Sequence, residues 1–203
     1  ELQVSRMILD CAHAELAKYL FQNATALQKL ELYEEMSNYL PNWKLTNLIA
    51  LTCTLRLSSC AILANFPKLR ELDVTLEPSF GDDVTIESGI LSELDHLNVE
   101  CNEQLPGGSI LAIVRMARSL RHLLLYMIQN DICHTEWVSI AKYCPQLLTF
   151  SVWTCDLPDA TLGELSRLCP HIRTLAMGYS GSITDAGVLF ITQRLQHLQS
   201  LVL

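Results

Sequence analysis

The chain has 203 residues, with 14 Lys and Arg against 22 Asp and Glu, and therefore a formal net charge of −8 at pH 7. No basic run is present, which argues against a nucleic-acid partner because phosphate binding depends on clustered Lys and Arg. No apolar stretch reaches the roughly 18 to 20 residues of a membrane span, so a membrane protein is not expected. The acidic balance favours a basic protein segment as the charged ligand.

A short apolar pattern recurs along the chain, with apolar residues at positions 1, 4 and 6 of the template L-x-x-L-x-L-x-x-[NC]. Its clearest copy is formed by Leu147, Phe150, Val152 and Cys155. Eight copies can be aligned, and their first residues are Leu27, Leu45, Leu69, Leu94, Leu120, Leu147, Ile172 and Leu198. The gaps between them are 18, 24, 25, 26, 27, 25 and 26 residues. All but the first lie in the range of about 20–29 that is typical of leucine-rich repeats.

The copies divide a single domain, 1–203, into an irregular part at 1–68 and a regular part at 69–203. In the first part, Leu2 and Val4 are predicted to end one further strand, and a helix-like segment follows at 10–21. The stretch 33–44 contains Pro41 and is too short for a normal helix, and 77–89 is expected to be a loop. The last copy is followed by no polar repeat, which indicates a segment of a longer chain or an end covered by another polypeptide.

The spacers between copies predict helices that begin at capping residues. We expect Ser109 to cap a helix at 110–117, Thr135 one at 136–143 and Asp159 one at 160–168, with a further helix within 181–195. Strands and helices that alternate at this spacing predict an α/β fold. The expected architecture is a leucine-rich-repeat solenoid, or horseshoe, of about eight repeats with an inner parallel β-sheet and outer α-helices.

The positions of the eight cysteines argue against a disulfide scaffold, and four of them are predicted to be packing residues of the repeat. Cys53 and Cys155 occupy template position 9, where a small thiol can pack against the turning backbone. Cys144 and Cys169 each precede a proline, three residues before a predicted strand. Free buried cysteines persist in reducing compartments, so a cytoplasmic or nuclear location is expected.

The stretch 144–155 fits the phrase Cys-Pro-x-Leu-x-x-Leu-x-Leu-x-x-Cys, with Phe150 and Val152 in place of the second and third leucines. Together with Ile-Thr-Asp-x-Gly at 183–187, it resembles the cysteine-containing leucine-rich repeat of F-box/LRR proteins. It is also similar to the repeats of the yeast mitotic-exit antagonist family. F-box/LRR proteins are substrate receptors of Skp1–cullin–F-box ubiquitin ligases. This sequence contains no F-box, so the resemblance implies contact with Skp1 and cullin only through an F-box outside this chain.

Candidate binding residues follow from strand geometry. Template positions 1, 4 and 6 point into the core, so positions 3, 5 and 7 are expected on the inner strand face. In the copy that begins at Leu45 these are Asn47, Ile49 and Leu51. The candidate partner-binding set is Glu71, Asp73, His96, Glu100, His122, Leu124, Tyr126, Met127, Trp153 and Tyr179.

The candidate set forms two zones. The earlier copies present carboxylates, including Glu31, and the later ones present apolar and aromatic residues. Such a surface suits a protein or peptide ligand that carries a basic side chain near an apolar anchor. Alternatively, Trp153 and Tyr126 stack across strands and only stabilise the sheet, and the carboxylates form a solvated face.

Signals for catalysis are weak, and no enzyme, cofactor or metal site is predicted. Cys133, His134 and Glu136 are adjacent but lack a second ligand pair at a recognisable distance. His96 and His122 recur at position 3 of neighbouring copies, so their side chains are expected to be neighbours that could bind metal, sense pH or simply be surface polar residues. The predicted function is protein interaction, as substrate recognition for a Skp1–cullin–F-box type ligase. The alternative is a structural scaffold subunit of a larger intracellular assembly.

Overall fold

The computed structural model describes residues 4–9, 24–32, 45–77, 90–103, 105, 108–126, 132–153, 157–178 and 181–203. These residues form an α/β fold with one nine-stranded sheet, in which every strand pairs in parallel with the next strand of the chain. The strands are β1 Arg6–Leu9, β2 Lys29–Leu32, β3 Ala50–Arg56, β4 Glu71–Glu77, β5 His96–Glu100, β6 His122–Tyr126, β7 Thr149–Trp153, β8 Thr174–Gly178 and β9 Ser200–Val202.

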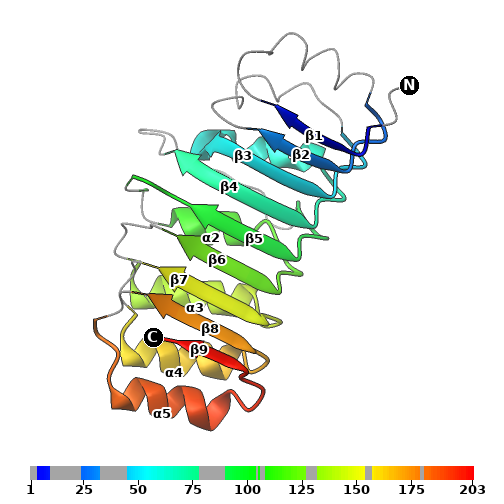
Figure 1. The fold of residues 1–203 in the computed structure, drawn as a ribbon. Coiled ribbons are helices and arrows are strands. Elements are labelled where there is room, and N and C mark those ends of the chain that lie inside the picture. Colours follow the sequence, from blue (N-terminus) through cyan, green and yellow to red (C-terminus); the bar gives the residue numbers. More distant parts are fainter. Residues whose placement is uncertain are drawn as a thin grey trace.

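The helices lie on one face of the sheet, and the sheet stays open and does not close into a barrel (Figure 1). They are η3 Leu57–Asn65, a 3₁₀ helix, and the α-helices α2 Ser109–Val114, α3 His134–Tyr143, α4 Asp159–Leu168 and α5 Asp185–Arg194. Each helix connects two neighbouring parallel strands. The opposite face of the sheet therefore carries no helix in the described part of the chain.

The strands are aligned so that equivalent residues form continuous rows across the sheet. The first row consists of Arg6, Lys29, Ala50, Glu71, His96, His122, Thr149, Thr174 and Ser200, each paired by Cα register with the next. Successive members are 21 to 27 residues apart. Side chains alternate between the two faces along each strand, so a shared register gives every strand the same two sides.

The strand starts are held by the same backbone hydrogen bonds in each copy. The carbonyl of the residue before one strand accepts N–H groups from two successive residues at the start of the next, as when Arg70 accepts from Asp95 and His96 at 2.9 Å. A tight turn precedes β2 to β5 and β7 to β9, for example from Leu69 N–H to the Phe66 carbonyl at 3.1 Å. These bonds satisfy backbone groups that would otherwise be buried without partners.

The core lies between the sheet and the helices. In β4 the burial alternates along the strand, and Leu72, Val74 and Leu76 are each 2% exposed. From the helix side, Trp137 of α3 packs edge-on against Phe150 of β7, with ring centroids 5.8 Å apart. Burying each such side chain contributes about 1.5–3 kcal/mol, which makes this layer the main source of stability.

The predicted register of the second copy is wrong by three residues. Ala50 pairs with Lys29 and with Glu71, so the copy begins at Leu48 and not at Leu45. Leu45 instead occupies the preceding turn, where its carbonyl accepts from Leu48 N–H at 3.0 Å. Leu51, expected on the exposed face, is 1% exposed in the core. The corrected start gives spacings of 21 residues on both sides, within the range of leucine-rich repeats.

The expected strand at the beginning of the chain is present, but it lies at Arg6–Leu9, after Val4 and not at it. Its pairing with β2 extends the sheet by one strand. The predicted helix-like segment at 10–21, the irregular stretch at 33–44 and most of the predicted loop at 77–89 lie outside the described residues. Glu77 itself ends β4.

The helices occur where they were predicted, but their caps differ. α2 begins at Ser109 after Gly108, whose φ of 81° favours glycine, and it ends at Val114, short of the expected Ala117. α3 begins at His134, so Thr135 is inside the helix. Asp159 is the first residue of α4 and does not cap it. Its carboxylate instead accepts hydrogen bonds from the backbone N–H and hydroxyl of Thr184, the residue that caps α5.

The cysteines in the described part of the chain are free thiols. Cys144 and Cys169 are buried as predicted, and the Cys169 thiol donates to the Cys144 carbonyl at 3.3 Å. Burial raises the pKa of each of these two thiols to about 12. Cys53 is also buried, but it lies inside β3 and not in the predicted position after the strand. Cys155 lies outside the described residues.

Candidate functional site

The face of the sheet opposite the helices, the open face, is formed by three rows of side chains. The first is the row of Arg6 to Ser200 given above, which includes His96 and His122. The second consists of Ile8, Glu31, Thr52, Asp73, Asn98, Leu124, Ser151, Ala176 and Val202, and the third of Thr54, Thr75, Glu100, Tyr126, Trp153 and Gly178. All predicted binding residues that the structure describes lie in these rows. Met127 and Tyr179 lie outside the described residues.

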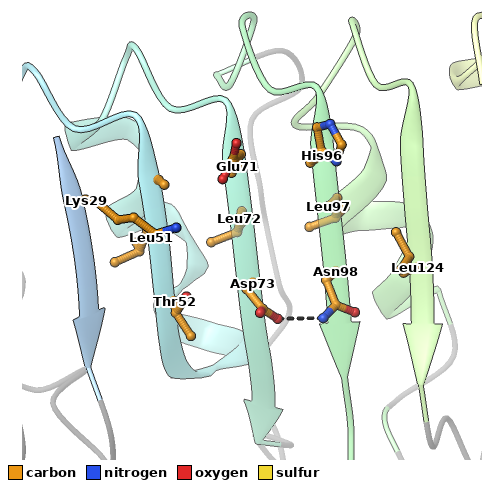
Figure 2. Close-up of a pocket in the computed structure, with 11 residues that line it drawn as sticks. Lys29, Leu51, Thr52, Glu71, Leu72, Asp73, His96, Leu97, Asn98 and Leu124 are labelled. Atoms are coloured by element: carbon orange, nitrogen blue, oxygen red, sulfur yellow. Dashed lines mark hydrogen bonds between the residues drawn. The ribbon is translucent and has the colours of Figure 1, made fainter. Parts of the chain in front are cut away.

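A hollow of about 260 Å³ lies on the open face over β2 to β6, and Figure 2 shows the residues around it. Charged and polar side chains line it, joined by Leu124 on the β6 side: Lys29, Thr52, Glu71, Asp73, His96 and Asn98. Several predicted binding residues therefore share one depression. Lys29, Thr52 and Asn98 were not in the predicted set, and Thr52 was missed because the copy was aligned on Leu45.

The side chains of Asp73 and Asn98 are joined by a hydrogen bond inside this hollow. Asn98 Nδ2 donates to Asp73 Oδ1 at 2.6 Å (Figure 2). The carboxylate fixes the amide orientation, because the reverse orientation would place two oxygens together. Asn98 Oδ1 is then buried without a hydrogen-bond partner among the described residues.

The charges of the open face are mixed in sign. Arg6 pairs with Glu31 at 2.7 Å, so Glu31 is not a free member of the expected acidic zone. Lys29 lies beside the hollow, while Glu71 and Asp73 present exposed carboxylates on β4. The negative part of the face is therefore centred on β4.

His96 and His122 are neighbours, as predicted. Their rings stack with centroids 3.8 Å apart and planes 9° apart. His122 Nδ1 lies 3.0 Å from Thr149 Oγ1, and His96 Nε2 lies 3.6 Å from Asp95 Oδ2. Burial, and secondarily the neighbouring His96, lower the pKa of His122 below its ordinary value of 6.5. His122 is therefore suited to the neutral form near pH 7.

The apolar zone is formed by Leu124, Tyr126 and Trp153, all of which are partly exposed. The rings of Tyr126 and Trp153 are nearly parallel, with centroids 6.3 Å apart. Trp153 Nε1 donates to Ser151 Oγ at 2.9 Å. Glu100 lies next to Tyr126 in the sheet register, so a carboxylate borders the aromatic pair. Aromatic side chains in such a setting can bind a partner, but they also stabilise the sheet.

The adjacent residues Cys133, His134 and Glu136 do not assemble a reactive centre. Cys133 Sγ contacts Thr135 Oγ1 at 3.1 Å, while His134 Nδ1 contacts Thr161 Oγ1 of α4 at 2.9 Å. The hydroxyl of Thr135 lowers the pKa of the Cys133 thiol. The two side chains therefore contact different threonines, and the thiol is not activated by the imidazole.

Comparisons with known proteins give a structural likeness alone. No protein-family model and no curated protein matches the sequence. One similar solved structure is a protein of Bacteroides fragilis from the Northeast Structural Genomics Consortium, with a TM-score of 0.46 and 12% identity. The match covers 98% of this chain and 65% of that one. None of the helices in the described part of the chain combines the length and apolar character needed to cross a membrane.

Proposed function

We propose that the chain is a leucine-rich-repeat solenoid that acts as a protein-interaction module. Three observations support the repeat architecture: the strands follow chain order, equivalent residues recur 21 to 27 apart, and the same turn precedes β2 to β5 and β7 to β9. Solenoids of this kind use extended exposed surfaces for binding. Fold alone does not define the partner, whose chemistry is inferred from the side chains of the open face.

The observation that carries this proposal is the apolar zone of Leu124, Tyr126 and Trp153 beside the hollow. A partner's apolar side chain would cover Leu124 and Tyr126, where aromatic groups give much contact area at little cost in rotamer entropy. A Lys or Arg of the same partner would reach Glu71 or Asp73 on β4. We therefore infer a protein or peptide ligand with an apolar anchor near a basic residue. Neither a nucleic acid nor a membrane is proposed as partner, and no enzymatic activity or cofactor is proposed.

The biological role that we propose is substrate recognition for a Skp1–cullin–F-box type ubiquitin ligase. It rests on the cysteine-containing repeat phrase at 144–155 and the Ile-Thr-Asp-x-Gly phrase at 183–187. In this role the open face holds the substrate, and an F-box outside this chain recruits Skp1 and cullin. A cytoplasmic or nuclear location accompanies the proposal.

The alternative function is that of a structural scaffold subunit in a larger intracellular assembly. It is favoured by the apolar side chain of Leu189 on α5, which is 54% exposed. A permanent subunit contact would bury such a surface.

The two functions differ in which partner proteins remain bound when the side chains of the open face are changed. The test is purification of the native protein from its own cells, followed by mass spectrometry, as wild type and as the double variant Leu124→Ser with Tyr126→Ala. Tyr143→Ala on α3, whose side chain is 39% exposed, is the matched control. We expect Skp1 and a cullin with all three proteins and loss of further partners with the double variant alone. A stoichiometric assembly without Skp1 that survives the double variant would support the scaffold and contradict the receptor.

A further inference from the structure

A group of potential metal ligands lies on the open face where two central strands of the sheet begin. Asp95 directly precedes β5, His96 begins that strand, and His122 begins β6 beside it. Each offers one ligand atom, and these three atoms lie within 4.8 Å of one another. Ligands around a tetrahedral ion with bonds of about 2.0–2.1 Å are roughly 3.4 Å apart, so coordination requires side-chain rotation that brings the three atoms closer together.

The ring of His122 is already oriented for such a role. Its Nδ1 lies 3.0 Å from the Thr149 hydroxyl, which leaves Nε2 available. In a neutral imidazole one nitrogen carries the proton and the other can bind a metal. A hydrogen bond to the distal nitrogen is the usual way in which proteins orient a metal-binding histidine.

The two stacked rings must separate before both can bind one ion. Rings that are parallel and 3.8 Å apart cannot direct their in-plane lone pairs at the same point. His96 is the ring that can turn, because its side chain is 48% exposed and the second torsion of histidine has a broad minimum. Its contact with Asp95 is 3.6 Å long, so the rotation breaks no short hydrogen bond.

The charged side chains around these three residues have opposite effects on the binding of a cation. Arg121 Nε lies 3.6 Å from Asp95 Oδ1 and disfavours a cation at that carboxylate. The Arg121 side chain is 55% exposed and can therefore move into solvent when an ion binds. Glu71 pairs with His96 in the sheet register and adds negative charge on the other side. All three side chains are at least partly exposed, so an ion can reach them from solvent.

We propose that Asp95, His96 and His122 bind a divalent transition-metal ion of the zinc class, with solvent in the remaining coordination position. Two imidazoles and one carboxylate suit Zn²⁺, and they suit neither Ca²⁺ nor Mg²⁺, which prefer oxygen ligands. The site is distinct from the apolar zone of Leu124, Tyr126 and Trp153. Its existence does not depend on the proposed partner binding.

The test is a calorimetric titration of the reduced wild-type protein with Zn²⁺ alone. We expect one saturable site that is weakened about tenfold or more by His96→Gln and by His122→Gln. His171→Gln, at an exposed turn before β8, and Cys133→Ser, which removes an exposed thiol, are the controls and should bind as the wild type. Equal affinity in the two histidine variants, or the absence of a saturable site in the wild type, would overturn the proposal.

A second measurement does not depend on how the variants fold. Addition of paramagnetic Co²⁺ to the wild type should shift the ring proton signals of two of the six histidines in an NMR spectrum. The His96→Gln variant, altered at an exposed side chain, assigns one of them. Shifts confined to the other four histidines would contradict the site.

Discussion

Trp153 of β7 lies across Gly178 of β8 so closely that a Cβ atom on Gly178 would overlap the indole carbons Cε3 and Cζ3. The indole also donates to Ser151. Trp153 therefore has a packing role on the open face in addition to any contact with a partner. Tyr126, at the same level on β6, has no comparable constraint from a glycine.

Replacing Gly178 with Ala should lower the free energy of unfolding by about 1–3 kcal/mol, because the added methyl group displaces the indole. Urea unfolding measures the loss, and tryptophan fluorescence reports the displacement. Gly181→Ala is the control, since a Cβ there would have no atom within 4 Å. In a Trp153→Ala background the Gly178→Ala change should cost much less, and an unchanged cost would contradict the packing role.

Leu123 and Tyr126 should separate stability from binding, since they lie on opposite faces of β6. Leu123 is 0% exposed, and Leu123→Ala should cost about 2–5 kcal/mol in the free energy of unfolding. Tyr126→Ala should cost much less, because its side chain is partly exposed on the open face. Chemical denaturation of both variants checks this expectation. Similar losses would place Tyr126 in the core and remove it from the binding surface.

The corrected start of the second copy predicts different effects for Leu51 and Ile49. Leu51→Ala should cost about 2–5 kcal/mol because the side chain is 1% exposed in the core. Ile49→Ala should cost less, since Ile49 is partly exposed before β3. Thermal unfolding compares them. Small effects of both changes would support the original alignment on Leu45, in which both side chains point outward.

The wrong start predicted for the second copy shows what sequence periodicity could and could not specify. Leu45, Leu48 and Leu51 are spaced three apart, so the template fits from either Leu45 or Leu48. Spacing distinguishes the two, because only the start at Leu48 gives 21 residues on both sides. Leu91, Leu94 and Leu97 are also spaced three apart, but a start at Leu91 would place the polar His96 at template position 6, whereas a start at Leu45 places the apolar Ala50 there. In the later copies the predicted rows match the sheet register from Glu71 to Thr174.

Part of the candidate site was also predictable from the sequence. Alternation along strands predicted that His96 and His122 would be neighbours, and the structure confirms this. Asp95 was missed because it precedes the strand, where alternation gives no direction for a side chain. The close packing of Trp153 on Gly178 was not predicted, although a glycine beside a tryptophan in the same row was a possible signal. The tie between Asp159 and Thr184 was missed because Asp159 was assigned as a cap.

The hydrogen bonds from Thr184 to the Asp159 carboxylate predict a dependence of stability on pH. The hydroxyl of Thr184, together with backbone N–H groups of Thr184 and Gly187, holds the pKa of Asp159 below its ordinary value of 3.8. Because the folded pKa is lower than the unfolded one, the contribution is present above the unfolded value and is lost as pH falls through it towards the folded value.

Asp159→Asn should therefore destabilise the protein at pH 6 and should lose less stability than the wild type on acidification to pH about 3. Urea midpoints across this range measure the difference. Glu164, whose pKa Arg167 also lowers, titrates in both proteins, so the comparison isolates Asp159. Parallel pH profiles for the two proteins would contradict the role of the Thr184 contact.

Binding of a protein segment by the open face can be measured by selecting peptides from a random display library on the purified chain. We expect enriched peptides with an apolar residue near Lys or Arg, whose binding is lost in the double variant Leu124→Ser with Tyr126→Ala and retained in Tyr143→Ala. Selected peptides that bind the double variant as tightly as the wild type would show that the open face is not the binding surface.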